Sequence, residues 1–119
     1  MMRERTNSLN VFFYSTTSGN EPVREWINSL SKENKKIIGA DIMTVQFGYP
    51  IGMPLTRVLI GTDGLEEIRC KLVGNQIARI IFYVEDDIMV LLHAFIKKTQ
   101  KTPQKELDLA IKRYKELCK

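Results

Sequence analysis

Three apolar, β-forming segments of this sequence carry charged or proton-transferring side chains on one of their two alternating faces, three in the first segment, two in the second and one in the third. In a strand, alternate side chains point to the same face of the sheet, so the polar residues of each segment share a face. If the three polar faces lie on one side of the sheet, they form a single surface suited to binding phosphate groups. The residues concerned are Glu67, Arg69, Lys71, Arg79, Tyr83 and His93, with Lys97 and Lys98 just beyond the third segment.

This set of residues indicates chemistry on an RNA phosphodiester without a cofactor. RNA can be cleaved without a metal when the neighbouring 2′-OH attacks the phosphorus, because the substrate then supplies the nucleophile. The protein must take the 2′-OH proton, give a proton to the leaving 5′-oxygen and neutralise the charge on the phosphorane. His93, Glu67, Tyr83 and the lysines are candidates for the proton transfers. A lysine can serve as base only if desolvation or nearby positive charge lowers its pKa.

Each of these residues also has a structural interpretation. Arg69 and Arg79 could be cross-strand partners of Glu67 on a solvated sheet, which the pattern supports equally well. His93 is the only histidine and lies among apolar residues. In such a setting a hydrogen-bonded, half-buried histidine is more common than a catalytic one. The alternation alone leaves both interpretations open.

No motif for a metal or a nucleotide accompanies these residues. The sequence has no CxxC, HxxxH or DxD cluster, no Walker loop and no GxGxxG. Cys70 and Cys118 lack the spacing of a metal site. The first ten residues are polar and carry Glu4, which is typical of neither a signal peptide nor a transit peptide. We therefore expect free thiols, no cofactor, no bound metal and a cytoplasmic location.

The positive charge is concentrated at the C-terminal end. The chain has 119 residues and a net charge of +4; residues 97–119 hold eight Lys or Arg against three Asp or Glu. Clustered cations suit a polyanion, because they replace the counterions condensed along phosphates. A solvated helix face, kept soluble by lysines, explains the same charges equally well. No apolar stretch is long enough to cross a membrane.

The spacing of apolar residues predicts one α+β domain spanning residues 1–119. A strand over 9–15 should be followed by two helices, the first beginning near Pro22 and the second capped by Ser31. From Arg57 onward, apolar residues tend to recur at every second position. This spacing predicts four strands near 57–60, 65–72, 76–84 and 88–95. Short turns between them predict an antiparallel meander. Thr102 as N-cap and Pro103 at the first helical position predict a final basic helix. The expected order is β-αα-ββββ-α, with a mainly antiparallel sheet packed against the helices.

Three segments of this sequence resemble a known toxin family when taken together. They are Gly64 to Arg69, Ala78 to Tyr83, and Leu91 to Pro103, of which the stretch from His93 to Pro103 is the most specific. In this order and spacing they resemble HigB-like toxins, in the phage-derived branch of the RelE/ParE superfamily. The resemblance covers nearly the whole chain and implies a RelE-like fold.

The resemblance also implies a function and partners. It implies the toxin of a type II toxin-antitoxin module, which enters the ribosomal A site beside the 16S rRNA and cleaves mRNA as a metal-independent endoribonuclease. The partner would be a HigA-like helix-turn-helix antitoxin. The residues implied as catalytic are Arg69, Arg79, His93, Lys97 and Lys98. Those implied in RNA binding are Lys71, Tyr83, Phe95 and Lys101, with Glu67 as a further acid or base.

Two other classes of function remain open on the sequence. A ParE-like inhibitor of DNA gyrase shares this fold and acts by protein binding. A non-catalytic prophage protein could use the basic helix only to bind nucleic acid. Cleavage of mRNA with arrest of translation would indicate the ribonuclease, whereas an SOS response with stalled gyrase would indicate the inhibitor.

Overall fold

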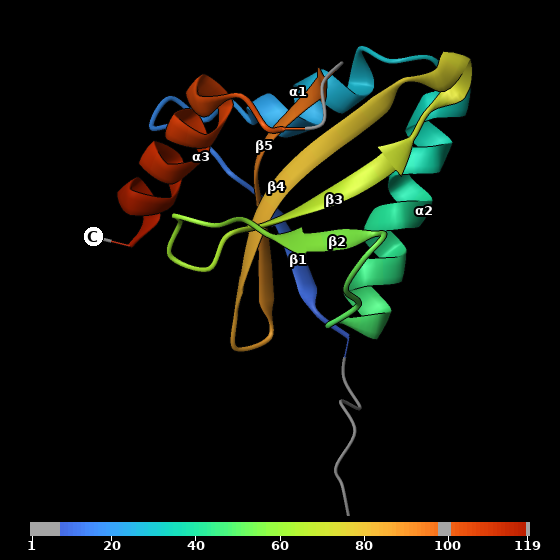
Figure 1. The fold of residues 1–119 in the computed structure, drawn as a ribbon. Coiled ribbons are helices and arrows are strands. Elements are labelled where there is room, and N and C mark those ends of the chain that lie inside the picture. Colours follow the sequence, from blue (N-terminus) through green and yellow to red (C-terminus); the bar gives the residue numbers. More distant parts are fainter. Residues whose placement is uncertain (1–7, 98–100, 119) are drawn as a thin grey trace, which may run out of the picture.

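The computed structural model describes residues 8–97 and 101–118 and has an α+β fold (Figure 1). Between β3 and β4 it adds a short 3-10 turn, η1, to the expected order of elements, which is otherwise confirmed. The elements are β1 (Asn10–Phe13), α1 (Pro22–Asn28), α2 (Lys32–Gly48), β2 (Thr56–Val58), β3 (Glu66–Lys71), η1 (Val73–Asn75), β4 (Ile77–Glu85), β5 (Ile88–Lys97) and α3 (Gln104–Leu117). Within the two described ranges, no helix is long and apolar enough to span a membrane.

The five strands form one mixed sheet in the order β1-β5-β4-β3-β2. Strands β2 to β5 pair with their sequence neighbours in antiparallel fashion, as the short turns between them predict. Strand β1 pairs with β5 in parallel, and the chain crosses through α1 and α2 to reach β2 at the opposite edge of the sheet. The mainly antiparallel sheet expected from the sequence is confirmed.

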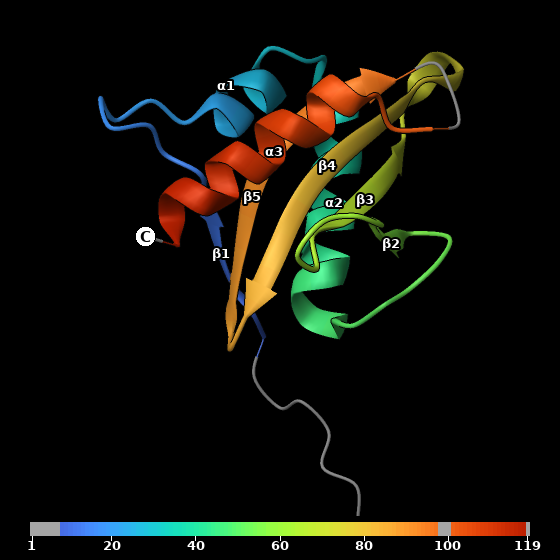
Figure 2. The same cartoon turned by 60° about the vertical axis from the view of Figure 1, so that its left-hand side comes forward.

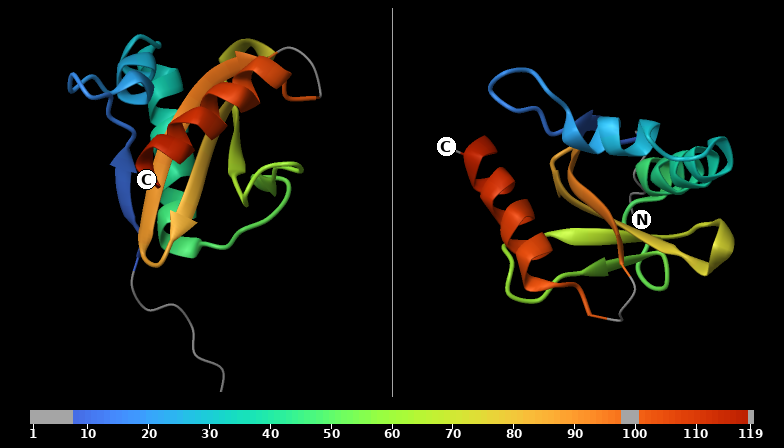
Figure 3. Two further views of the ribbon diagram at one scale, coloured as in Figure 1. Left: turned by 90° about the vertical axis from the view of Figure 1, so that its left-hand side faces the viewer. Right: turned by 90° about the horizontal axis from the view of Figure 1, so that it is seen from above.

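Helices cover both faces of the sheet (Figure 3). On one face, α1 packs against β1 and β5 and α2 packs against β3, with Ile38 and Val45 of α2 fully buried. On the other face, Ala110 of α3 is buried over a smaller apolar cluster that includes Leu92 and Phe95 of β5. In Figure 2, α3 crosses β5 at an angle and does not extend over β2 and β3. The second face is therefore only partly covered by the described helices.

A β-bulge in β5 changes which side chains share a face. Ile81 pairs with His93 but Phe82 pairs with Leu91, which leaves Leu92 as an extra residue. Strict alternation predicts Leu92 and Ala94 on one face and Leu91 and His93 on the other, and this prediction is wrong. Leu92 packs beneath α3, whereas Leu91 and Ala94 belong to the core beneath α1 and α2. The bulge brings His93 and Phe95 to the α3 side, which they share with Ile81 and Arg79 of β4.

The two predicted helix caps have different outcomes. Oγ of Ser31 accepts a hydrogen bond from the backbone N–H of Asn34 at 3.2 Å, so the predicted cap of α2 is confirmed. The predicted cap of α3 is wrong, because Pro103 occupies the N-cap position and no side chain caps this helix. Thr102 precedes the cap, and its hydroxyl donates to Glu67 of β3 instead.

Candidate active site

Glu67 of β3 is fully buried and accepts hydrogen bonds from side chains of three other segments. Its Oε2 accepts hydrogen bonds from Nη2 of Arg57 at 2.8 Å and from Nη1 of Arg79 at 2.5 Å. Its Oε1 accepts one from Oγ1 of Thr102 at 3.1 Å. The Thr102 hydroxyl in turn lies 3.5 Å from Nζ of Lys97. We refer to these five residues as the Glu67 cluster.

The register of the sheet explains why these side chains meet. Arg57 lies directly opposite Glu67 across the β2–β3 pair, and Arg69 lies opposite Arg79 across the β3–β4 pair. Lys97 pairs with Ile77 at the end of β5, two positions along β4 from Arg79. All of them are on the α3 side of the sheet, because their strand positions share a face with Ile81 and Phe95 of the apolar cluster beneath α3. Backbone pairing thus places three arginines and a lysine around one carboxylate.

Arg79 is a buried partner of Glu67 rather than a surface residue. It is 2% exposed, and its Nε has no hydrogen-bond partner among the described residues. Burial lowers the pKa of its guanidinium from the usual value, and the nearby charge of Glu67 opposes that shift. The sequence-based expectation of a solvent-facing side chain is therefore wrong for Arg79. Arg69 is partly exposed and fits that expectation.

Lys97 combines burial with a strongly positive environment. It is 7% exposed, and burial together with the charge of Arg79 lowers its pKa to about 8. The charges of Arg57 and Arg69 act in the same direction, and Glu67 opposes them. At neutral pH, a lysine with this pKa carries no proton for an appreciable part of the time. Lys97 therefore meets the condition that the sequence-based argument set for a lysine base.

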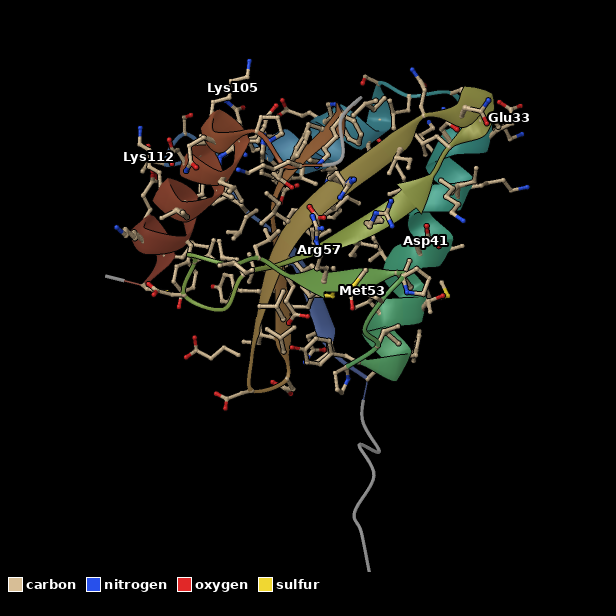
Figure 4. The ribbon with its side chains drawn as sticks, in the orientation of Figure 1. Glu33, Asp41, Met53, Arg57, Lys105 and Lys112 are labelled. Atoms are coloured by element: carbon tan, nitrogen blue, oxygen red, sulfur yellow. The ribbon has the colours of Figure 1, made fainter. Side chains whose placement is uncertain are left out.

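Four more accessible cations border the buried part of the cluster. Arg57 keeps 37% of its side chain exposed while it is bonded to Glu67, and it lies over the middle of the sheet in Figure 4. Arg69 is partly exposed, and Lys71 and Lys101 are exposed. These side chains are positioned to meet an anion before it reaches Lys97.

A second group of predicted site residues lies beneath α3. Nε2 of His93 is 2.6 Å from Oε1 of Glu106, and its ring stacks on Phe95 with 5.4 Å between ring centroids. Tyr83 packs edge-on against Tyr114, with its ring centroid 4.8 Å away. Burial lowers the pKa of His93 and raises that of Tyr83. His93 corresponds to the half-buried, hydrogen-bonded histidine that the sequence left open as an alternative.

Strand geometry separates the two groups. His93 lies four residues from Lys97 along β5, and Tyr83 lies four residues from Arg79 along β4. At a rise of about 3.3 Å per residue, the two Cα atoms of each pair are about 13 Å apart. His93 and Tyr83 contact Glu106 and Tyr114 of α3, respectively, and their predicted roles in the reaction stay predictions.

The structure brings together most of the predicted residues and adds two that the sequence argument missed. Glu67, Arg69, Arg79 and Lys97 meet, with Lys71 and Lys101 at the edge, whereas Lys98 lies outside the described residues. Arg57 and Thr102 were not predicted. Arg57 belongs to the alternating β2 segment, but the register that places it opposite Glu67 depends on the loop from residue 59 to 65. The sequence around Thr102 matches a helix N-cap, so its contact with Glu67 was not predicted.

The arrangement has two of the parts that metal-independent cleavage of a phosphodiester requires, cations for the phosphate and a base. Arg57 and Arg69 can bind a phosphate from the exposed side, and Lys97 can accept a proton. Glu67 has hydrogen bonds at both oxygens and no exposure, which suits it to holding the cations in place. Among the residues that the structure describes, no three His, Cys, Asp or Glu side chains are placed to hold a metal ion.

Comparison with protein families identifies a match over most of the chain. Residues 25–115 match the sequence profile of a family described as "Phage derived protein Gp49-like (DUF891)". The matched range includes every residue of the Glu67 cluster and covers well over half of the chain. A search of curated proteins found no match.

Proposed function

This chain belongs to the Gp49-like phage-derived family, a RelE-like toxin family of toxin-antitoxin systems, and from this premise we propose that it is a ribosome-dependent endoribonuclease. In this proposal it cleaves translated mRNA by metal-independent attack of the 2′-OH and so arrests translation. The observation that carries the proposal is Lys97, a lysine with a pKa of about 8 among three arginines on the partly uncovered sheet face.

Each residue of the Glu67 cluster has a role in the proposed reaction, together with the neighbouring Arg69. Arg57 and Arg69 bind the scissile phosphate and stabilise the negative charge that builds on the phosphorane. Neutral Lys97 takes the proton of the 2′-OH as the 2′-oxygen bonds to phosphorus. The bond between phosphorus and the 5′-oxygen breaks, and the 5′-oxygen takes a proton from water. The products are a 2′,3′-cyclic phosphate and a 5′-OH end.

Glu67, Arg79 and Thr102 position the reacting groups. A buried carboxylate is stable only with charged partners and hydrogen bonds, and the pair with Arg79 supplies the main one. Glu67 then fixes Arg57 directly and Lys97 through the Thr102 hydroxyl. These three residues act through others and need not touch the RNA.

The ribosome and an antitoxin complete the proposal. Figure 4 shows Lys105 and Lys112 extending outward from α3, away from the sheet. Cations on this surface suit the phosphate backbone of 16S rRNA around the A site. We also propose a HigA-like helix-turn-helix antitoxin as the cognate partner.

A defined cleavage assay tests this function. The purified protein is added to ribosomes paused on a labelled mRNA, and the ends of the fragments are analysed. Fragments with 2′,3′-cyclic phosphate and 5′-OH ends are expected, and a single 2′-deoxy substitution at the cut site should block cleavage. Intact mRNA at every protein concentration, together with gyrase trapped on DNA in a parallel assay, would favour the gyrase inhibitor instead.

A further inference from the structure

The two edge strands of the sheet, β1 and β2, differ in how they are protected from pairing with another chain. Natural edge strands are protected by charged side chains, by proline and by being short. β2 has three residues, includes the charged Arg57 and follows Pro54 closely. By contrast, the sequence between Arg5 and Glu21, which contains β1, has no charged residue and no proline. In the view from above in Figure 3, β1 lies at the outer end of the sheet.

The outer backbone groups of β1 are free at two positions of the strand. Alternate residues of a strand direct their N–H and C=O groups to opposite sides. The N–H groups of Asn10 and Tyr14 donate to carbonyl oxygens on the β5 side. Val11 and Phe13 therefore direct theirs outward, and among the described residues no hydrogen bond reaches these groups. At Leu9, α2 supplies partners for both outer groups, so the open stretch begins after this residue.

The side chains along this open stretch are apolar on both faces of the sheet. Phe12 pairs with a residue of the apolar cluster beneath α3, so it lies on the α3 side, where it is 53% exposed. Val11 and Phe13 lie on the other side and are partly exposed. The guanidinium of Arg24 lies 4.4 Å from the centroid of the Phe13 ring, and its charge is paired with a glutamate of the same segment. Exposed apolar side chains beside an open edge gain free energy when a partner strand covers them.

We propose that two copies of this chain associate by antiparallel pairing of their β1 strands, which joins the two sheets edge to edge. With a two-fold axis at Phe12, Val11 of each copy lies opposite Phe13 of the other. Each of these pairs uses the free N–H and C=O groups of both residues. The two Phe12 side chains then meet at the axis, in the closely spaced kind of pair that has no hydrogen bonds. The proposal does not depend on the ribonuclease function.

A second copy suits this edge because the edge is complementary to itself. Every pair in this register is aromatic with aromatic or aromatic with β-branched, and such pairs stabilise antiparallel strands. Each copy has a net charge of +4, so other faces repel one another, whereas this pairing brings no like charges together. One strand pair makes a small interface, and we expect a dissociation constant of about 10 μM. Strands β5 and β4 separate β1 from β3, so the Glu67 cluster of each copy stays uncovered.

Cysteine cross-linking of the full chain tests the register. Phe12→Cys is combined with Cys118→Ser, because Cys118 is exposed whereas Cys70 is buried. In the proposed dimer the two Cα atoms at position 12 are about 4.5 Å apart, which a disulfide can span, so oxidation should give a covalent dimer. The matched control is Asn10→Cys with the same serine change, on the same face of the same strand. Its two Cα atoms would be about 14 Å apart, so it should not be cross-linked.

Sedimentation of the unmodified chain from about 1 to 300 μM tests association itself. Phe12→Lys places two positive charges opposite each other at the axis and should raise the dissociation constant at least about tenfold. Phe47→Lys makes the same change at a similarly exposed phenylalanine of α2, 64% exposed, and should associate as the wild type does. Thermal unfolding at low concentration confirms that both variants are folded.

The opposing outcomes are distinct. A wild type that is monomeric at the highest concentration would overturn the proposal, and so would equal cross-linking of Phe12→Cys and Asn10→Cys. Dimers that survive Phe12→Lys but not Phe47→Lys would place the contact on α2 instead. None of these positions belongs to the Glu67 cluster, so the results are independent of whether the protein cleaves RNA.

Discussion

Replacing Lys97 by Arg separates its charge from its ability to accept a proton. The guanidinium keeps the positive charge, but its pKa is too high for it to lose a proton near neutral pH. With a pKa of about 8, roughly one Lys97 side chain in ten is neutral at pH 7 and roughly nine in ten at pH 9. If neutral Lys97 is the base, wild-type cleavage should rise about tenfold between these pH values and level off above them.

The assay is single-turnover cleavage of mRNA on paused ribosomes, with saturating protein, from pH 6.5 to 9. Lys97→Arg should lower the rate by about a hundredfold or more and flatten the dependence on pH. Lys112→Arg makes the same change on the outer side of α3 and should keep the wild-type rate and profile (Figure 4). A wild-type profile without the rise, or a Lys97→Arg variant as fast as the control, would refute the assignment of the base.

Three further predictions test the positions of other residues. Thr102→Val should slow cleavage by about tenfold and shift the pH profile, because it removes the hydroxyl between Glu67 and Lys97, whereas Thr102→Ser should restore both. Arg79→Met should lower the free energy of unfolding in urea by about 3 kcal/mol, because it breaks a buried ion pair; an equal effect in the partly exposed Arg69→Met would contradict this. Because burial lowers the pKa of His93, the fold binds that proton less readily than the unfolded chain, so the wild type should lose stability as the pH falls below about 6.5. His93→Gln should lose less free energy of unfolding between pH 7.5 and 5.5 than the wild type loses. An equal loss in the two proteins would contradict this prediction.

The order of elements could be predicted from the sequence because local signals agree with the fold. Apolar spacing, Gly and Pro at the turns and the Ser31 cap all indicate the observed elements. Alternation in β3 and β4 correctly places Glu67, Arg69 and Arg79 on one face. These predictions need only the geometry of a single strand or helix.

The details of the site depend on interactions between segments and could not be predicted in this way. The bulge at Leu92 breaks the alternation of β5, and its carbonyl oxygen accepts a hydrogen bond from Nη1 of Arg113 in α3. The burial of Arg79 depends on its ion pair with Glu67, and the role of Thr102 depends on a side chain 35 residues away. A polar residue that fits a local motif can thus instead form a hydrogen bond with a residue far away in the sequence.

The burial of Arg79 also changes which variant tests activity. An Arg79→Ala protein would lose stability as well as charge, so loss of toxicity would have two explanations. Arg69 is partly exposed and Lys97→Arg keeps the charge, which makes changes at these two positions cleaner probes of the reaction.

The most direct measurement of the central claim is transcript-end mapping after brief induction in a bacterial host. The wild type is compared with Lys97→Arg, with the control Lys112→Arg, and with a sample in which translation is blocked. New 5′ ends within translated regions should appear for the wild type and the control, and should be absent from Lys97→Arg and from the blocked sample. Growth arrest without new ends, or the same ends in Lys97→Arg, would contradict a ribosome-dependent ribonuclease with Lys97 at its active site.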